Sequence, residues 1–66
     1  MIIKSQTGKC HDIYEFSTSG VSVFCKDNID RRYKHILGTY NSRERATQVF
    51  QEIRCETSGY YEMPIE

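Results

Sequence analysis

Two short segments, 10–16 and 21–25, alternate apolar and polar residues, as strands with one buried face do. A turn rich in Ser, Thr and Gly at 17–20 joins them. A loop of this length would pair Phe16 with Val21 in an antiparallel hairpin. Five apolar residues would then share one face of the hairpin: Tyr14, Phe16, Val21, Val23 and Cys25.

Strands are also predicted on either side of this hairpin. Residues 1–6 form the first strand and end at the Thr7-Gly8 turn, while residues 31–40 form a strand with a weaker pattern. The pattern leaves open whether Tyr33, His35 and Leu37 or instead Ile36 and Tyr40 face inward. Gly38 indicates either a bulge in this strand or a place where the helix packs close to the strand.

A single helix is predicted over about 42–57. Asn41 or Ser42 is its N-cap, and Glu44 lies in the first turn, where a carboxylate suits the helix dipole. Four residues recur at i, i+3, i+4 and i+7 and predict a buried stripe with Phe50 as its anchor: Ala46, Val49, Phe50 and Ile53. Gly59 suits a stop after the last turn, and Tyr60 to Met63 then make a short last strand.

This order of elements predicts one α+β domain over residues 1–66. Its architecture is an antiparallel meander of three to four strands, covered on one face by the helix. A chain of 66 residues is near the lower limit for an independent core, so a partner, a disulfide or a metal would add useful stability.

Charge is balanced over the whole chain, with nine basic and nine acidic residues. Residues 26–45 hold six basic and three acidic residues, a net charge of +3, and residues 46–66 hold one basic and four acidic residues, a net charge of −3. The basic region interleaves with Tyr33 and Tyr40, a combination that can hold phosphates and stack bases. The candidate nucleic-acid residues are Arg31, Arg32, Lys34, Arg43 and Arg45.

Motifs for catalysis or cofactor binding are not recognised in the sequence. Cys10, His11, Cys25, His35 and Cys55 are of metal-ligand type, but none of the usual ligand spacings occurs, and we expect no metal site and no cofactor. No Gly-rich phosphate loop or nucleophile with an adjacent base stands out, so we expect a protein that is not an enzyme.

The N-terminal segment has no apolar signal core, and no run of residues approaches transmembrane length. We therefore expect a cytoplasmic protein without a membrane role, with its three cysteines as free thiols. Cys55 lies opposite the apolar stripe of the helix, and its reactivity stays open.

One helix on an antiparallel sheet leaves the second sheet face open, and apolar residues there favour association. The candidate interaction residues are Ile13, Phe24, Tyr60 and Tyr61. The sequence thus predicts a non-catalytic protein-interaction or assembly module, with a homodimer as one form. The alternative is a weak nucleic-acid-binding accessory protein that uses the basic 31–45 region.

The segments ILGTYNSRERATQVFQEI, residues 36–53, and YYEMP, residues 60–64, resemble a pattern in small uncharacterised proteins from Firmicutes and their phages. Those proteins read ILG-x-Y-x-[ST]-x-ERA-x-x-V-x-x-EI, followed by an aromatic-rich segment that ends in MP. The resemblance covers about a third of the chain. It implies a sheet-plus-helix domain of phage or mobile-element origin, and it implies no activity.

Overall fold

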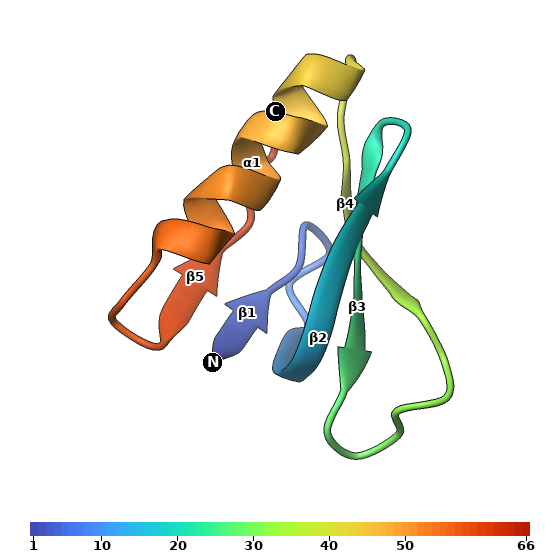
Figure 1. Ribbon diagram of the computed structural model, residues 1–66, viewed down its shortest axis with the longest axis vertical. Helices are drawn as coiled ribbons and strands as arrows, with labels where there is room; N and C mark the ends of the chain where they lie inside the picture. Colours follow the sequence, from blue (N-terminus) through green and yellow to red (C-terminus); the bar gives the residue numbers. More distant parts are fainter.

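The computed structural model describes residues 1–66 and consists of one helix packed on a five-stranded sheet (Figure 1). The elements are β1 (Ile2–Lys4), β2 (Cys10–Ser19), β3 (Ser22–Asp27), β4 (His35–Thr39), α1 (Arg43–Cys55) and β5 (Tyr60–Glu62). The strand order in the sheet is β4-β3-β2-β1-β5. The predicted α+β class with one covering helix is confirmed.

The sheet is mixed, whereas the sequence predicted an antiparallel meander. Strands β1 to β4 do form antiparallel neighbours, but β5 pairs in parallel with β1 at the far edge. The reason is the connection: α1 carries the chain back across the sheet, so β5 enters beside β1 in the same direction (Figure 1).

The β2–β3 hairpin differs from its predicted register. Phe16 pairs with Cys25 and not with Val21, because both strands extend further and the loop is only Gly20-Val21. Gly20 has φ 59° at the first central position, which matches the requirement of a type II′ turn. The shift is four residues, an even number, so Phe16, Val23 and Cys25 keep their predicted shared face.

The prediction was wrong for two of the five residues that it placed on the apolar face of the hairpin. Val21 lies in the turn and is exposed. Tyr14 lies at a β-bulge, where the pairing shifts between Ile13 and Glu15, and its side chain is 48% exposed. The bulge lets Ile13 and Phe16, three residues apart, both pack against the core.

Strand β4 shows which residues of the predicted strand 31–40 face the core. Leu37 faces the core and is 1% exposed, whereas its neighbour Ile36 is 60% exposed. The pairing with β3 skips Leu37, since Val23 pairs with Gly38 and Phe24 pairs with Ile36. Gly38 therefore follows a bulge, one of its two predicted roles, and a Cβ there would lie 3.0 Å from both the Gln6 side chain and the Tyr40 hydroxyl.

Helix α1 begins after Ser42, whose hydroxyl accepts a hydrogen bond from the Arg45 backbone N–H at 3.1 Å. Ser42, and not Asn41, is the N-cap. One cluster of buried residues joins the helix to the sheet: Ile3, Val23, Cys25, Leu37, Tyr40, Ala46, Val49, Ile53 and Met63. Phe50 is half-buried at the rim, with its ring 5.1 Å from that of Phe16, so it does not anchor the stripe.

No helix in the structure is both long enough and apolar enough to cross a bilayer.

Gln6 closes the β4 edge of the sheet. Its backbone N–H donates to the carbonyl of Leu37, and its side-chain oxygen accepts from the Thr39 N–H at 2.8 Å. The Gln6 amide group also donates to the carbonyls of Pro64 and Ile65 in the C-terminal segment. The Leu37 carbonyl and the Thr39 N–H on the outer side of β4 are therefore already paired, which disfavours addition of another strand at this end of the edge.

Candidate functional site

The face of the sheet that points away from α1 has no helix or further strand packed over it (Figure 1). We call it the open face. Strand alternation places five large apolar or aromatic residues on it: Ile2, Tyr14, Phe24, Ile36 and Tyr60. Phe24 pairs directly with Ile36 across β3 and β4, and Ile2 pairs directly with Tyr60 across β1 and β5. These four side chains therefore form two cross-strand pairs, one on each side of β2.

Four charged residues of the open face form two ion pairs. Lys26 lies 3.5 Å from Glu15 across the β2–β3 pair, and Lys4 lies 3.5 Å from Glu62 across the β1–β5 pair. Such surface pairs add little stability. Asp12, which lies opposite Ile2 on the same face, has no basic partner and accepts a hydrogen bond from the Asn28 side chain.

Two cations from the β3–β4 loop lie over aromatic rings of the open face. The Arg31 guanidinium is 4.1 Å from the centre of the Tyr14 ring, and the Lys34 ammonium is 5.3 Å from the centre of the Phe24 ring. Neither cation forms an ion pair with a carboxylate. The open face is therefore aromatic and aliphatic, with an uncompensated basic rim.

Of the four candidate interaction residues, Phe24 and Tyr60 lie on the open face. Ile13 lies on the other side of the sheet, where it packs against the core because of the bulge. Tyr61 also packs there, and its hydroxyl donates to Glu52 of α1 at 2.7 Å. Burial and the nearby Glu52 carboxylate raise the pKa of Tyr61, so its hydroxyl stays protonated and keeps this bond.

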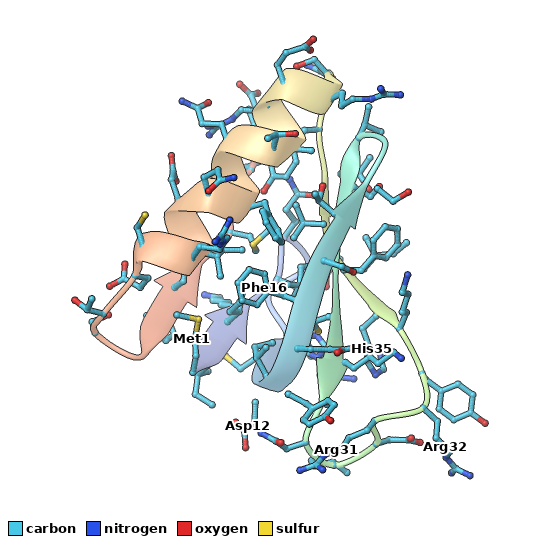
Figure 2. The ribbon with its side chains drawn as sticks, in the orientation of Figure 1. Met1, Asp12, Phe16, Arg31, Arg32 and His35 are labelled. Carbon is cyan, nitrogen blue, oxygen red and sulfur yellow. The ribbon has the colours of Figure 1, made fainter.

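The five candidate nucleic-acid residues fall into two separate groups. Arg31, Arg32 and Lys34 belong to the β3–β4 loop, whereas Arg43 and Arg45 belong to the first turn of α1 at the opposite end of the molecule (Figures 1 and 2). Arg45 is also engaged locally, since its guanidinium donates to the Glu66 carbonyl and to Gln48. The structure does not bring the five side chains into one patch.

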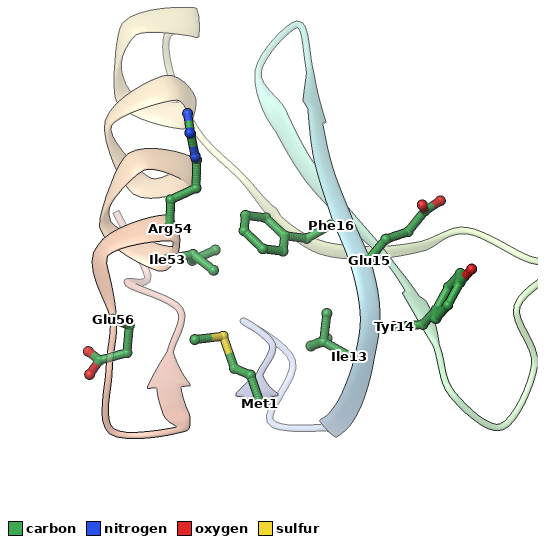
Figure 3. A pocket seen from close by; sticks show the side chains of 8 residues that line it. All are labelled: Met1, Ile13, Tyr14, Glu15, Phe16, Ile53, Arg54 and Glu56. Carbon is green, nitrogen blue, oxygen red and sulfur yellow. The ribbon is translucent and has the colours of Figure 1, made fainter.

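A groove of about 480 Å³ opens between the C-terminal half of α1 and β2. Figure 3 shows Met1, Ile13, Phe16 and Ile53 directed into the gap, and Tyr14 and Glu15 on the other side of β2. Arg54 and Glu56 stand at its helix side. The groove is an apolar recess at the rim of the core, with no convergent set of polar groups for catalysis.

A second feature is a compact polar cluster on the helix-facing side of β2, β3 and β4. We call its four residues the polar cluster: His11, Cys25, Asp27 and His35. His11 Nδ1 lies 3.0 Å from both carboxylate oxygens of Asp27, and the Cys25 thiol donates to Asp27 Oδ1 at 3.4 Å. His35 Nε2 is 3.9 Å from Asp27 Oδ2, and the two imidazole rings are 5.2 Å apart.

The polar cluster sets the protonation of two of its members. Burial, together with the hydrogen bond to Asp27 and its charge, raises the pKa of the Cys25 thiol to about 12. Burial alone would also raise the pKa of Asp27, but the hydrogen bonds from His11 and Cys25 and the two nearby imidazoles outweigh it and lower that pKa. Cys25 is thus a protonated hydrogen-bond donor in this arrangement, not a nucleophilic thiolate.

Sequence reasoning missed Asp27 because it placed residues 26–30 in a turn. Extending the alternation of Val23 and Cys25 by two residues would have put Asp27 on the same face. The sequence also grouped Cys10 with His11 as candidate ligands, but adjacent strand residues point to opposite faces, and Cys10 is exposed.

Comparisons with protein-family models, with curated proteins and with solved structures gave no match to this chain.

Proposed function

We propose that this chain is a non-catalytic interaction module that binds a protein partner through the open face of its sheet. The observation that carries the proposal is the composition of that face. Phe24, Ile36 and Tyr14 offer apolar and aromatic contact area, and Glu15 and Lys26 beside them pair with each other. Docking on such a surface leaves few charges newly buried without partners.

The rim of the open face suggests the chemistry of the partner. Arg31 and Lys34 lie over aromatic rings and have no carboxylate partner in the chain. We infer a partner segment with apolar side chains flanked by carboxylates, because these would meet the aromatic centre and the basic rim together. The β4 edge is closed by Gln6, so the sheet face and not that edge is the proposed contact surface.

A non-catalytic role is supported by the polar cluster. Its one thiol, that of Cys25, is 1% exposed and is held protonated beside Asp27. A group in that state cannot attack a substrate. The three free cysteines also suit a reducing compartment, so we propose a cytoplasmic setting. A phage or mobile-element origin rests on the sequence resemblance alone.

The test compares two isoleucine substitutions of equal chemistry. Ile36→Glu changes the open face, and Ile65→Glu changes an exposed isoleucine in the C-terminal segment. A protein captured by the wild-type chain from source cells would be identified, purified and titrated calorimetrically against both variants. We expect Ile36→Glu to weaken binding at least about tenfold and Ile65→Glu to leave it unchanged.

Equal affinity of both variants for the purified partner would contradict the proposal. So would failure to capture any protein, provided that light scattering also shows a strict monomer at high concentration. Self-association that Ile36→Glu abolishes would identify the partner as a second copy of the chain, the homodimer form of the proposal.

One observation favours a second candidate function, weak binding of single-stranded nucleic acid. A guanidinium and an ammonium over aromatic rings on a sheet combine the two contacts that such binding uses. Fluorescence anisotropy with a labelled oligonucleotide would show binding that weakens steeply with salt and is reduced by Arg31→Gln but not by Arg43→Gln. Absence of binding at low salt would exclude this function.

A further inference from the structure

We propose that His11, Cys25, Asp27 and His35 bind a Zn²⁺ ion. The four side chains come from three adjacent strands, β2, β3 and β4, and no two of them have a spacing in sequence that would mark a metal site. The inference goes beyond the interaction role, because it concerns the helix-facing side of the sheet and not the open face.

The donor atoms are already close to the spacing that a metal requires. One ligand atom each from His11, Cys25 and Asp27 lies within 4.8 Å of the others. In a tetrahedral Zn²⁺ site, bonds of about 2.0–2.3 Å place neighbouring donors about 3.3–3.8 Å apart. The Asp27 oxygens lie 3.0, 3.4 and 3.9 Å from donors of His11, Cys25 and His35, respectively. His35 lies outside the group of three close donors, and its side chain would have to turn toward them to complete the site.

The donor set suits zinc in kind and in charge. Two imidazole nitrogens, one thiolate and one carboxylate oxygen are all established zinc ligands. On binding, the Cys25 thiol would release its proton to solvent and the sulfur would form a bond to the metal. The thiolate and the Asp27 carboxylate would then neutralise the two positive charges of the ion, so the buried site would carry no net charge.

Burial distinguishes the polar cluster from ordinary surface groups. His11 and Cys25 are buried at 4% and 1% exposure, in positions where the core of a small domain would normally hold apolar residues. A paired but metal-free cluster of this kind contributes little stability compared with apolar packing. A bound ion would instead link three strands of a chain with a small core.

Access for the ion is provided on the β4 side. The His35 side chain is 34% exposed and that of Asp27 is 14% exposed, so these two ligands form the outer wall of the site. Four protein ligands leave no open position for substrate, which makes the proposed site structural and not catalytic.

The test uses Co²⁺ as a spectroscopic probe in a Cys10→Ser/Cys55→Ser background, in which Cys25 is the only thiol. We expect one Co²⁺ per chain, with the visible bands of tetrahedral cobalt and a cobalt–thiolate charge-transfer band in the near ultraviolet. Zn²⁺ should displace the cobalt and raise the thermal unfolding midpoint. Failure to bind Co²⁺ stoichiometrically, or a spectrum without the thiolate band, would overturn the proposal.

Two further variants assign the ligands. Cys25→Ser in the same background should lose the thiolate band. His35→Gln replaces a half-exposed residue, so its metal-free fold should persist by circular dichroism, and its Co²⁺ affinity should fall more than about tenfold. An unchanged affinity and spectrum in folded His35→Gln would overturn the four-ligand site, and a thiolate band that survives in Cys25→Ser would overturn the site altogether.

Discussion

The two faces of the sheet differ in how their polar groups are compensated. On the helix side, the polar cluster lies at the strand positions next to Val23 and Leu37, and its members contact one another. On the open face, the ion pairs are exposed and apolar residues stand between them. Burial makes every contact on the first side matter for stability, whereas the second side can change with little effect on folding. If the proposed function is correct, the helix side of these strands provides stability and the open face provides recognition.

The largest expected effect compares adjacent residues of β4 that point to these two faces. Leu37→Ala should reduce the free energy of unfolding by about 2–5 kcal/mol, because it leaves a cavity in the core. Ile36→Ala removes an exposed side chain and should change it by less than about 0.5 kcal/mol. Urea unfolding of both variants measures the difference, and similar losses would break the distinction between the faces.

A smaller effect is expected at the sheet edge that Gln6 closes. Gln6→Ala should reduce the free energy of unfolding by about 1–2 kcal/mol, since the Thr39 N–H and two C-terminal carbonyls lose their partner. Gln48→Ala is the control, because the hydrogen bond of the Gln48 side chain to Arg45 lies on the exposed helix surface. A stable Gln6→Ala variant would show that water replaces these bonds without cost.

The covering helix itself depends on its N-cap. Ser42→Ala should reduce the free energy of unfolding by about 1 kcal/mol, as the Arg45 N–H loses its acceptor. Asn41→Ala, at the other residue that the sequence offered as a cap, should change it by less than about 0.5 kcal/mol. Chemical denaturation of both variants measures these free energies. A larger loss for Asn41→Ala than for Ser42→Ala would mean that α1 begins one residue earlier, with Asn41 as its N-cap.

The smallest effect is expected on the open face. A double-mutant cycle with Glu15→Gln and Lys26→Gln should give a coupling free energy below about 1 kcal/mol, which falls further in high salt. A larger coupling that salt does not reduce would mean that this pair contributes to the fold. The open face would then be less free to serve recognition.

Local patterns in the sequence predicted what local interactions determine. The helix, its apolar stripe and the Gly38 bulge follow from residue spacing and backbone chemistry. The hairpin face was mostly correct despite a wrong register, because the error was an even number of residues. The parallel pairing of β5 was missed, since a three-residue strand contains nothing that specifies its partner.

The polar cluster could not be predicted from the sequence, for a different reason. His11, Asp27 and His35 lie far apart in sequence, and their contact depends on the hairpin register, the bulge at Tyr14 and the pairing of Cys25 with His35. None of these long-range features is encoded within a single segment. Likewise, only the bulge places Ile13 against the core, so alternation alone assigned it to the wrong face.

We propose that the open face, and not the helix side, contacts a partner. Amide chemical-shift mapping of the ¹⁵N-labelled chain, titrated with the purified partner, tests this claim most directly. We predict shifts that concentrate at Tyr14, Phe24 and Ile36 and at the neighbouring β3–β4 loop. Shifts confined to the exposed side of α1, or to the groove lined by Met1 and Ile53, would contradict the account.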